Sequence, residues 1–193
     1  FVMYKTITTM KRILFFCGII ALIFIVSGCL TVEKKTYTFK IEKTGVVTLT
    51  IDYYNIVSQD DDGQDVSFKD FGELVTDYMQ GEKLLETYPE ATIKDKKLFE
   101  KNGVLCGQAV VEFPSLEAAN LKQYKGKGPI MHYLGSFSET FDNSNGDYWG
   151  ANFPVIAWEE GTKDMVLSTI VTTDLSTSRP LLSHYKIWKE TNN

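Results

Sequence analysis

The sequence is poor in the residues that hold metals or cross-link small folds. It has three cysteines and two histidines among 193 residues. The histidines, His132 and His184, stand far apart, and there is no HExxH motif, close Cys/His set, Gly-x-Ser-x-Gly elbow or phosphate-binding glycine loop. These absences exclude the common zinc, serine-hydrolase and nucleotide motifs. We interpret each histidine as a partly buried polar residue.

Positive charge is also scarce. The chain has 25 acidic and 20 basic residues, and three of the basic ones, Lys5, Lys11 and Arg12, lie near the N-terminus. Residues 29–193 therefore carry 17 basic against 25 acidic residues, a net charge near −8. This balance argues against nucleic acid as a partner and against a polybasic membrane-binding surface.

One long apolar run is present, at residues 13–26, directly after Lys11-Arg12. Its length of about 14 residues suits the core of a secretory signal and falls short of the ~20 that span a bilayer. We expect translation to start at Met10, with residues 1–9 as upstream readthrough, because Phe1 is not an initiator. The sequence thus predicts a signal peptide over residues 1–28.

The run ends in Val26-Ser27-Gly28-Cys29, which resembles the lipobox of bacterial lipoproteins. The resemblance implies cleavage between Gly28 and Cys29 and a covalent diacylglycerol on Cys29, with no other cofactor. Each buried methylene contributes ~0.8 kcal/mol, so the acyl chains would hold the protein on a membrane. The alternative is an uncleaved anchor helix, which leaves the domain in the same compartment.

The resemblance also implies a place in the cell envelope, outside the cytoplasm. Leu30, and not the Asp that retains enteric lipoproteins, follows the cysteine. We therefore expect the outer membrane in a cell with two membranes, and the outer face of the cytoplasmic membrane in a cell with one.

Cysteine usage leaves the exported part without a disulfide. Cys17 would leave with the signal and Cys29 would be lipidated, so Cys106 stands alone. Its setting, Val104-Leu105-Cys106-Gly107 in an apolar strand, favours a small buried residue over a reactive thiol.

Alternation of apolar and polar residues predicts hairpins. Residues 36–53 alternate on both sides of Lys43-Thr44-Gly45, and residues 92–113 do so around Asn102-Gly103, with Leu105, Ala109, Val111 and Phe113 on one face. Further strands are expected over residues 130–141, 153–158 and 164–175.

Three helices are predicted between and after these strands. Ser67 and Asp70 suggest a capping box for a helix up to Gly81, with Phe68, Phe71, Leu74, Val75, Tyr78 and Met79 as its apolar stripe. Ser115 would cap a short helix over residues 116–124. Residues 180–189 favour a closing helix over a strand.

This order predicts one α+β domain over residues 36–193. We expect a largely antiparallel sheet built from hairpins in ββα-ββα order, with helices packed on one face. Residues 29–35 would be the lipidated cysteine and a short tether. The Lys43-Thr44-Gly45 turn and the stretch from Leu98 through Gly107 to Pro114-Ser115-Leu116-Glu117 resemble LppM-type lipoprotein domains in topology. That resemblance implies no catalytic residue.

Two polar clusters are candidate ligand sites. The first could ligate calcium through Asp60, Asp62 and Asp65, but its spacing departs from an EF-hand, so a solvated loop is the preferred interpretation. The second combines amides, carboxylates and aromatic rings, as sugar sites do, or is a long hairpin loop. Its residues are Asp142, Asn143, Asn145, Asp147, Tyr148 and Trp149.

The sequence favours a binding or interaction module of the cell envelope over an enzyme. Its partner would be an envelope protein, a glycan or a hydrophobic small molecule. The alternative is a lipid-anchored envelope hydrolase that uses a carboxylate pair drawn from Glu112, Glu139, Glu159 and Asp174. Convergence of such acids or of the histidines in a cleft would favour the enzyme, and an apolar groove would favour binding.

Overall fold

The computed structural model describes residues 30–135, 138–150 and 152–192. This part of the chain is mainly antiparallel β-sheet with a few helices, which confirms the predicted α+β class. The predicted signal peptide, the lipobox-like residues and Cys29 lie outside the described residues.

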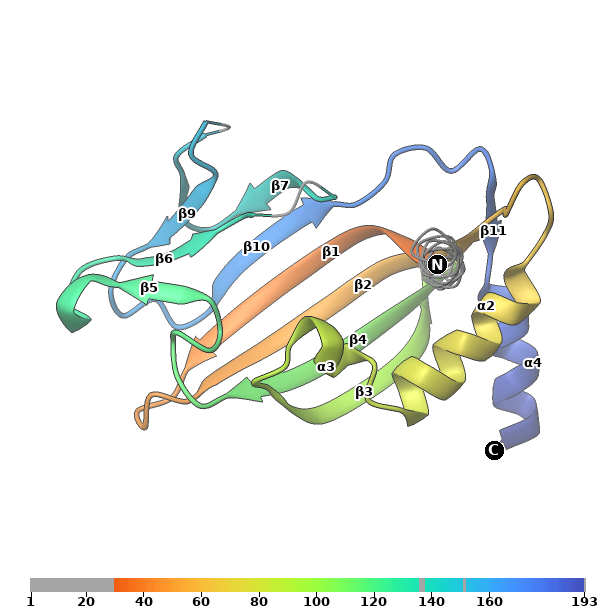
Figure 1. Ribbon diagram of the computed structural model, residues 1–193, viewed down its shortest axis with the longest axis horizontal. Helices are drawn as coiled ribbons and strands as arrows, with labels where there is room; N and C mark the ends of the chain where they lie inside the picture. The colour runs from red at the N-terminus through yellow and green to blue at the C-terminus, as the bar shows by residue number, and fades with distance from the viewer. Residues whose placement is uncertain (1–29, 136–137, 151, 193) are drawn as a thin grey trace, which may run out of the picture.

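The strands form two sheets (Figure 1). The large sheet has the order β3-β4-β2-β1-β10-β7, and β11 adds to β2. Its strands are β1 Leu30–Ile41, β2 Val47–Gln59, β3 Thr92–Lys101, β4 Val104–Phe113, β7 Thr140–Ser144, β10 Met165–Ile170 and β11 Ser178–Pro180. The small sheet has the order β5-β6-β9-β8, with β5 Leu121–Gln123, β6 Ile130–Tyr133, β8 Asp147–Tyr148 and β9 Val155–Trp158.

The helices are short. They are α2 Ser67–Glu73, the π-helix η1 Leu74–Gln80, α3 Leu84–Thr87, the 3-10 turn η2 Tyr124–Gly126 and α4 Leu182–Asn192. In Figure 1, α2 and α3 lie in front of the large sheet and α4 lies beside α2. The predicted closing helix is confirmed as α4.

The two predicted hairpins are confirmed, and their turns have the backbone that the sequence requires. Asn102 and Gly103 both have positive φ, 54° and 78°, which is the type I′ turn that suits the twist of a two-residue hairpin. Strand β2 carries an irregularity at Asn55, whose φ is 56° and whose side-chain amide donates to the Glu33 carboxylate at 2.8 Å. Asn tolerates this left-handed conformation better than most residues.

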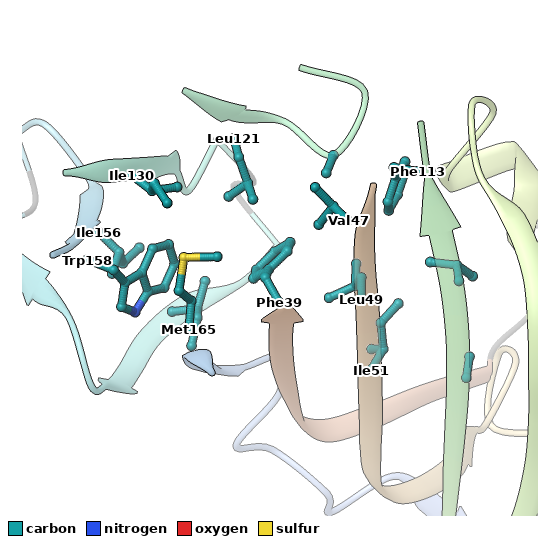
Figure 2. Packing of buried hydrophobic residues seen from close by; sticks show 14 of the residues in the cluster. Phe39, Val47, Leu49, Ile51, Phe113, Leu121, Ile130, Ile156, Trp158 and Met165 are labelled. Atoms are coloured by element: carbon teal, nitrogen blue, oxygen red, sulfur yellow. The ribbon is translucent and has the colours of Figure 1, made fainter. Parts of the chain in front are cut away.

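The main core lies between the large sheet and the small sheet (Figure 2). Phe39, Leu49 and Met165 of the large sheet pack against Ile156 and Trp158 of the small one. The predicted inward face of β4 is confirmed, since all four of its named residues are buried. Burial of a side chain of this size contributes roughly 1.5–3 kcal/mol, so this layer holds the two sheets together.

A second cluster lies under the helices at the other end of the same sheet face. Phe71, Leu74 and Val75 of α2 and η1 pack on Leu105 of β4 and Tyr185 of α4. Leu105 of this cluster and Ala109 of the main core lie an even number of residues apart on β4, so their side chains point to the same face of the sheet. Both clusters therefore cover one face. Cys106 is buried, as predicted.

Two predictions about the helix that begins at Ser67 are wrong. Its proposed capping residues contact side chains that are distant in the sequence. The capping box does not form: Val66 is the N-cap residue, Ser67 Oγ lies 3.3 Å from His184 Nε2, and Asp70 accepts a hydrogen bond from Ser58. Phe68, placed in the apolar stripe, is 81% exposed.

Further segments differ from expectation. The strand expected over residues 130–141 is replaced by β6 in the small sheet and β7 in the large one, and of residues 164–175 only Met165–Ile170 is strand. Residues 116–124 form a turn and then β5, because β5 pairs with β6; Ser115 Oγ still accepts from Ala118 N at 3.2 Å. Residues 30–35, expected as a tether, belong to β1 and pair with β2. Strand β1 is thus described from Leu30, the residue that follows Cys29 in the sequence.

Candidate functional site

A cavity of about 300 Å³ opens on the covered face of the large sheet. Its floor comes from β1, β2, β3 and β4, and its walls come from η1 and α3 with the residue after it. Most of its lining side chains are apolar or tyrosine. They include Leu30, Val32, Tyr53, Ile56, Leu74, Tyr78, Met79, Leu84, Tyr88, Leu98, Ala109 and Val171.

Small residues in β4 help to leave this space. Gly107 and Ala109 both line the cavity and carry little or no side chain. A Cβ on Gly107 would come within 3.1 Å of Ile56 Cδ1 and 3.4 Å of Leu98 Cδ2, so these two side chains close over the glycine.

Positive charge is present in the cavity wall. Lys35 and Lys96 line it from the covered face, whereas Lys97 alternates with Lys96 along β3, so its backbone lines the cavity and its side chain points to the opposite face. Lys96 donates to the Gly81 carbonyl at 2.6 Å, and Lys35 donates to Glu139. In the described residues neither Lys96 nor Lys97 has an ion pair with a carboxylate.

Glu139 is the centre of a polar cluster that includes Lys35 of the cavity lining. Its carboxylate accepts from Lys35 Nζ at 2.7 Å, Tyr37 OH at 2.9 Å and Thr169 Oγ1 at 2.6 Å. The Glu139 side chain is 10% exposed and that of Lys35 is 25% exposed. Three donors from two strands thus converge on one acid.

These contacts fix the ionisation of Glu139. Burial opposes the charged form, but the charge of Lys35 and the hydrogen bonds from Lys35, Thr169 and Tyr37 outweigh it. The pKa of this carboxyl therefore lies below its usual range. Glu139 is a carboxylate at neutral pH, and both of its oxygens are engaged.

The tyrosines around this cluster stay neutral. Burial is the main cause that raises the pKa of Tyr37 and Tyr53, and it raises the pKa of Tyr88 to about 12, with Glu139 adding to each shift. Near pH 7 the cavity therefore presents phenol groups at Tyr53 and Tyr88, which supply apolar ring surface and a polar hydroxyl.

The possible ligand loop, which the sequence also allowed to be a long hairpin loop, connects β7 of the large sheet with β8 of the small one. Asp142 pairs with Lys34, and Asn143 Oδ1 accepts from Ser144 N. The Oδ1 atom of Asn145 accepts from Trp158 Nε1 at 2.9 Å and Val166 N at 2.8 Å.

The rest of that loop is spread over both sheets. Asp147 and Tyr148 form β8, and the Tyr148 ring stacks on Phe141 at 4.0 Å between centroids. Trp149 is 54% exposed. Most of the named polar side chains thus have partners within the fold.

The weak calcium candidate, for which a solvated loop was the preferred interpretation, pairs with Arg179. Asp60 accepts two hydrogen bonds from the Arg179 guanidinium, both at 2.8 Å, and Asp65 Oδ1 accepts from Ser67 N. Asp62 lies in the turn with a φ of 48°. Within the described part of the chain, no group of three His, Cys, Asp or Glu side chains could hold a metal ion.

The other acids named for a hydrolase lie apart from Glu139. Glu112 pairs with Lys94, Asp174 accepts from Ser176, and Glu159 lies in the turn after β9. His132 Nδ1 lies 3.2 Å from the Asn120 carbonyl oxygen. Burial lowers the pKa of His132, and the Glu139 charge acts in the opposite direction.

Glu139 was predicted from the sequence as a candidate acid, whereas no residue of the cavity lining was predicted as a site. A signal was available in Tyr37 and Tyr53, whose side chains point inward from β1 and β2 and carry a polar group to a buried face.

No helix of the described residues is long and apolar enough to cross a membrane. No known protein family, curated protein or solved structure matches the chain.

Proposed function

We propose that the chain is a lipoprotein of the bacterial cell envelope, anchored through Cys29, whose folded domain binds a small, largely apolar molecule. The observation that carries the binding function is the cavity of about 300 Å³ between the helices and the sheet. Small-molecule sites are concave, mostly apolar and roughly 300–1,000 Å³ in volume. This cavity falls at the lower end of that range.

The lining indicates the chemistry of the ligand. Each methylene transferred from water into such a site contributes about 0.8 kcal/mol. Lys96 brings positive charge to the wall, where its Nζ donates to the Gly81 carbonyl, so a ligand with an acidic group at one end would gain an electrostatic contact. We therefore propose an apolar body with an acidic end.

A glycan is less well supported as ligand. Sugar sites need free polar side chains, and Asn145 in the predicted loop uses its side chain within the fold. The hydrolase alternative needs two carboxylates that face one cleft. Glu139 is the named acid that reaches the cavity lining, and three donors occupy its oxygens.

Binding of an anilinonaphthalene sulfonate tests the proposal, because this dye has apolar rings, one anionic group and fluorescence that rises in apolar surroundings. A form that begins at Leu30 keeps every contact given above and needs no detergent. Ala109→Phe would fill the cavity. Val110→Phe, the next residue of β4 on the opposite face, is the matched control.

We expect dye binding to the parent and to Val110→Phe, and loss of binding in Ala109→Phe. Thr87→Trp, at an exposed position of the cavity lining, gives a second obstruction that disturbs the core less. Thermal unfolding shows whether each variant is folded. Equal dye binding by folded Ala109→Phe, Thr87→Trp and parent would refute the cavity as the site.

A further inference from the structure

Three exposed aromatic side chains gather at one end of the small sheet. Tyr133, Trp149 and Phe153 are 51%, 54% and 57% exposed. Tyr133 pairs with Val155 in the sheet, and Trp149 N donates to the Val155 carbonyl at 3.0 Å, so both flank the same residue of β9. The Tyr133 and Phe153 rings lie 6.3 Å apart between centroids. We call these three residues the aromatic tip.

The sequence around the aromatic tip has no charge. Charged residues make up 23% of the chain, yet no Asp, Glu, Lys or Arg occurs in residues 129–138 or 148–158. At the average frequency, these two stretches would hold about five charged residues. The tip can therefore leave water without stripping an ion of its hydration shell, whose loss is costly.

The position of β1 in the sequence limits how far the domain can lie from a membrane anchor. Strand β1 begins at Leu30, so no free linker separates the domain from Cys29. If an acyl chain on Cys29 or the apolar run at residues 13–26 lies in a bilayer, the domain surface must rest close to that bilayer. A surface held there is expected to be uncharged and rich in Trp and Tyr, which concentrate at the membrane–water interface.

We propose that the aromatic tip inserts into the interfacial zone of the membrane that anchors the chain, as a second contact that fixes the orientation of the domain. The proposal rests on the membrane anchoring proposed above, but it does not depend on the cavity. It assigns Trp149 to the headgroup region, with Tyr133 and Phe153 beside it.

Quenching by brominated lipid tests this, because bromine on an acyl chain quenches only tryptophans at the bilayer. The full chain is reconstituted into phosphatidylcholine vesicles with and without dibrominated phosphatidylcholine. It has three tryptophans, of which Trp158 is 1% exposed and Trp188 packs against Phe71. We expect stronger quenching in the parent than in Trp149→Phe, in which the quenching that remains comes from Trp188, a partly buried residue of the cluster that Leu30 also contacts.

The paired substitution Tyr133→Ser/Phe153→Ser should weaken the quenching of Trp149. Phe68→Ser, which removes an even more exposed aromatic from α2, is the matched control and should leave quenching unchanged. Flotation separates the two proposals. A chain that does not float with the vesicles contradicts the proposed anchor. A chain that floats but whose Trp149 is not quenched contradicts the proposal that the aromatic tip contacts the membrane, and favours a protein partner for this surface.

Discussion

Replacing Glu139 with glutamine removes a carboxylate that Lys35, Tyr37 and Thr169 share. A hydrogen bond to a charged group contributes about 1.5–3 kcal/mol, and glutamine keeps one oxygen for the two hydroxyls while leaving Lys35 without its counter-charge. We expect the free energy of unfolding to fall by about 2–4 kcal/mol. In a domain of this size that corresponds to a drop in Tm of roughly 5–15 °C.

Urea unfolding followed by tryptophan fluorescence measures this loss. The matched control is Glu112→Gln, because Glu112 also pairs with one lysine at 2.7 Å but in an exposed setting. Such a surface pair is worth about 0–1 kcal/mol. If Glu139→Gln and Glu112→Gln lost the same small amount, the buried cluster would not stabilise the fold as described.

Further predictions concern pH and the contact between the two sheets. The folded-state pKa of Glu139 is lowered from 4.5, so its stabilisation is present above pH 4.5 and is lost as pH falls through the lower folded value. Urea unfolding of parent and Glu139→Gln at stepped pH should show a smaller difference below this window, and a constant difference would contradict the assignment. Asn145→Ala should cost about 1–3 kcal/mol, because Trp158 Nε1 and Val166 N lose their acceptor, whereas Asn143→Ala, which removes a contact to the adjacent Ser144, should cost less. Equal losses in these two variants, measured by urea unfolding, would show that Asn145 does not link the sheets.

The hairpins were predictable because their signals are local. Period-two alternation with an Asn-Gly turn determines β3 and β4 within about twenty residues of sequence. The wrong predictions share another cause. Ser67 has the sequence of a helix cap, but His184 lies near its hydroxyl from a position 117 residues away. Residues 116–124 have helical spacing, but pairing with β6 draws part of them into a sheet.

The candidate site was harder to predict for the same reason. Inward-facing Tyr37 and Tyr53 could be read from alternation on β1 and β2. The partner of Tyr37, Glu139, lies 102 residues further along the chain, and no pattern within either segment indicates that they meet. The cavity forms where the two core clusters adjoin and the side chains, such as those of Gly107 and Ala109, are too small to fill the space. Such a space follows only from tertiary packing.

Acyl labelling at Cys29 tests the central claim most directly. Cells that make the parent or Cys29→Ser are fed a tagged fatty acid, and the mass of the N-terminal peptide is then measured. We predict a labelled parent whose first residue is a diacylglyceryl-modified Cys29, and an unlabelled, unprocessed Cys29→Ser. Equal labelling of both chains, or a parent that keeps residues 10–28 and carries no lipid, would contradict it.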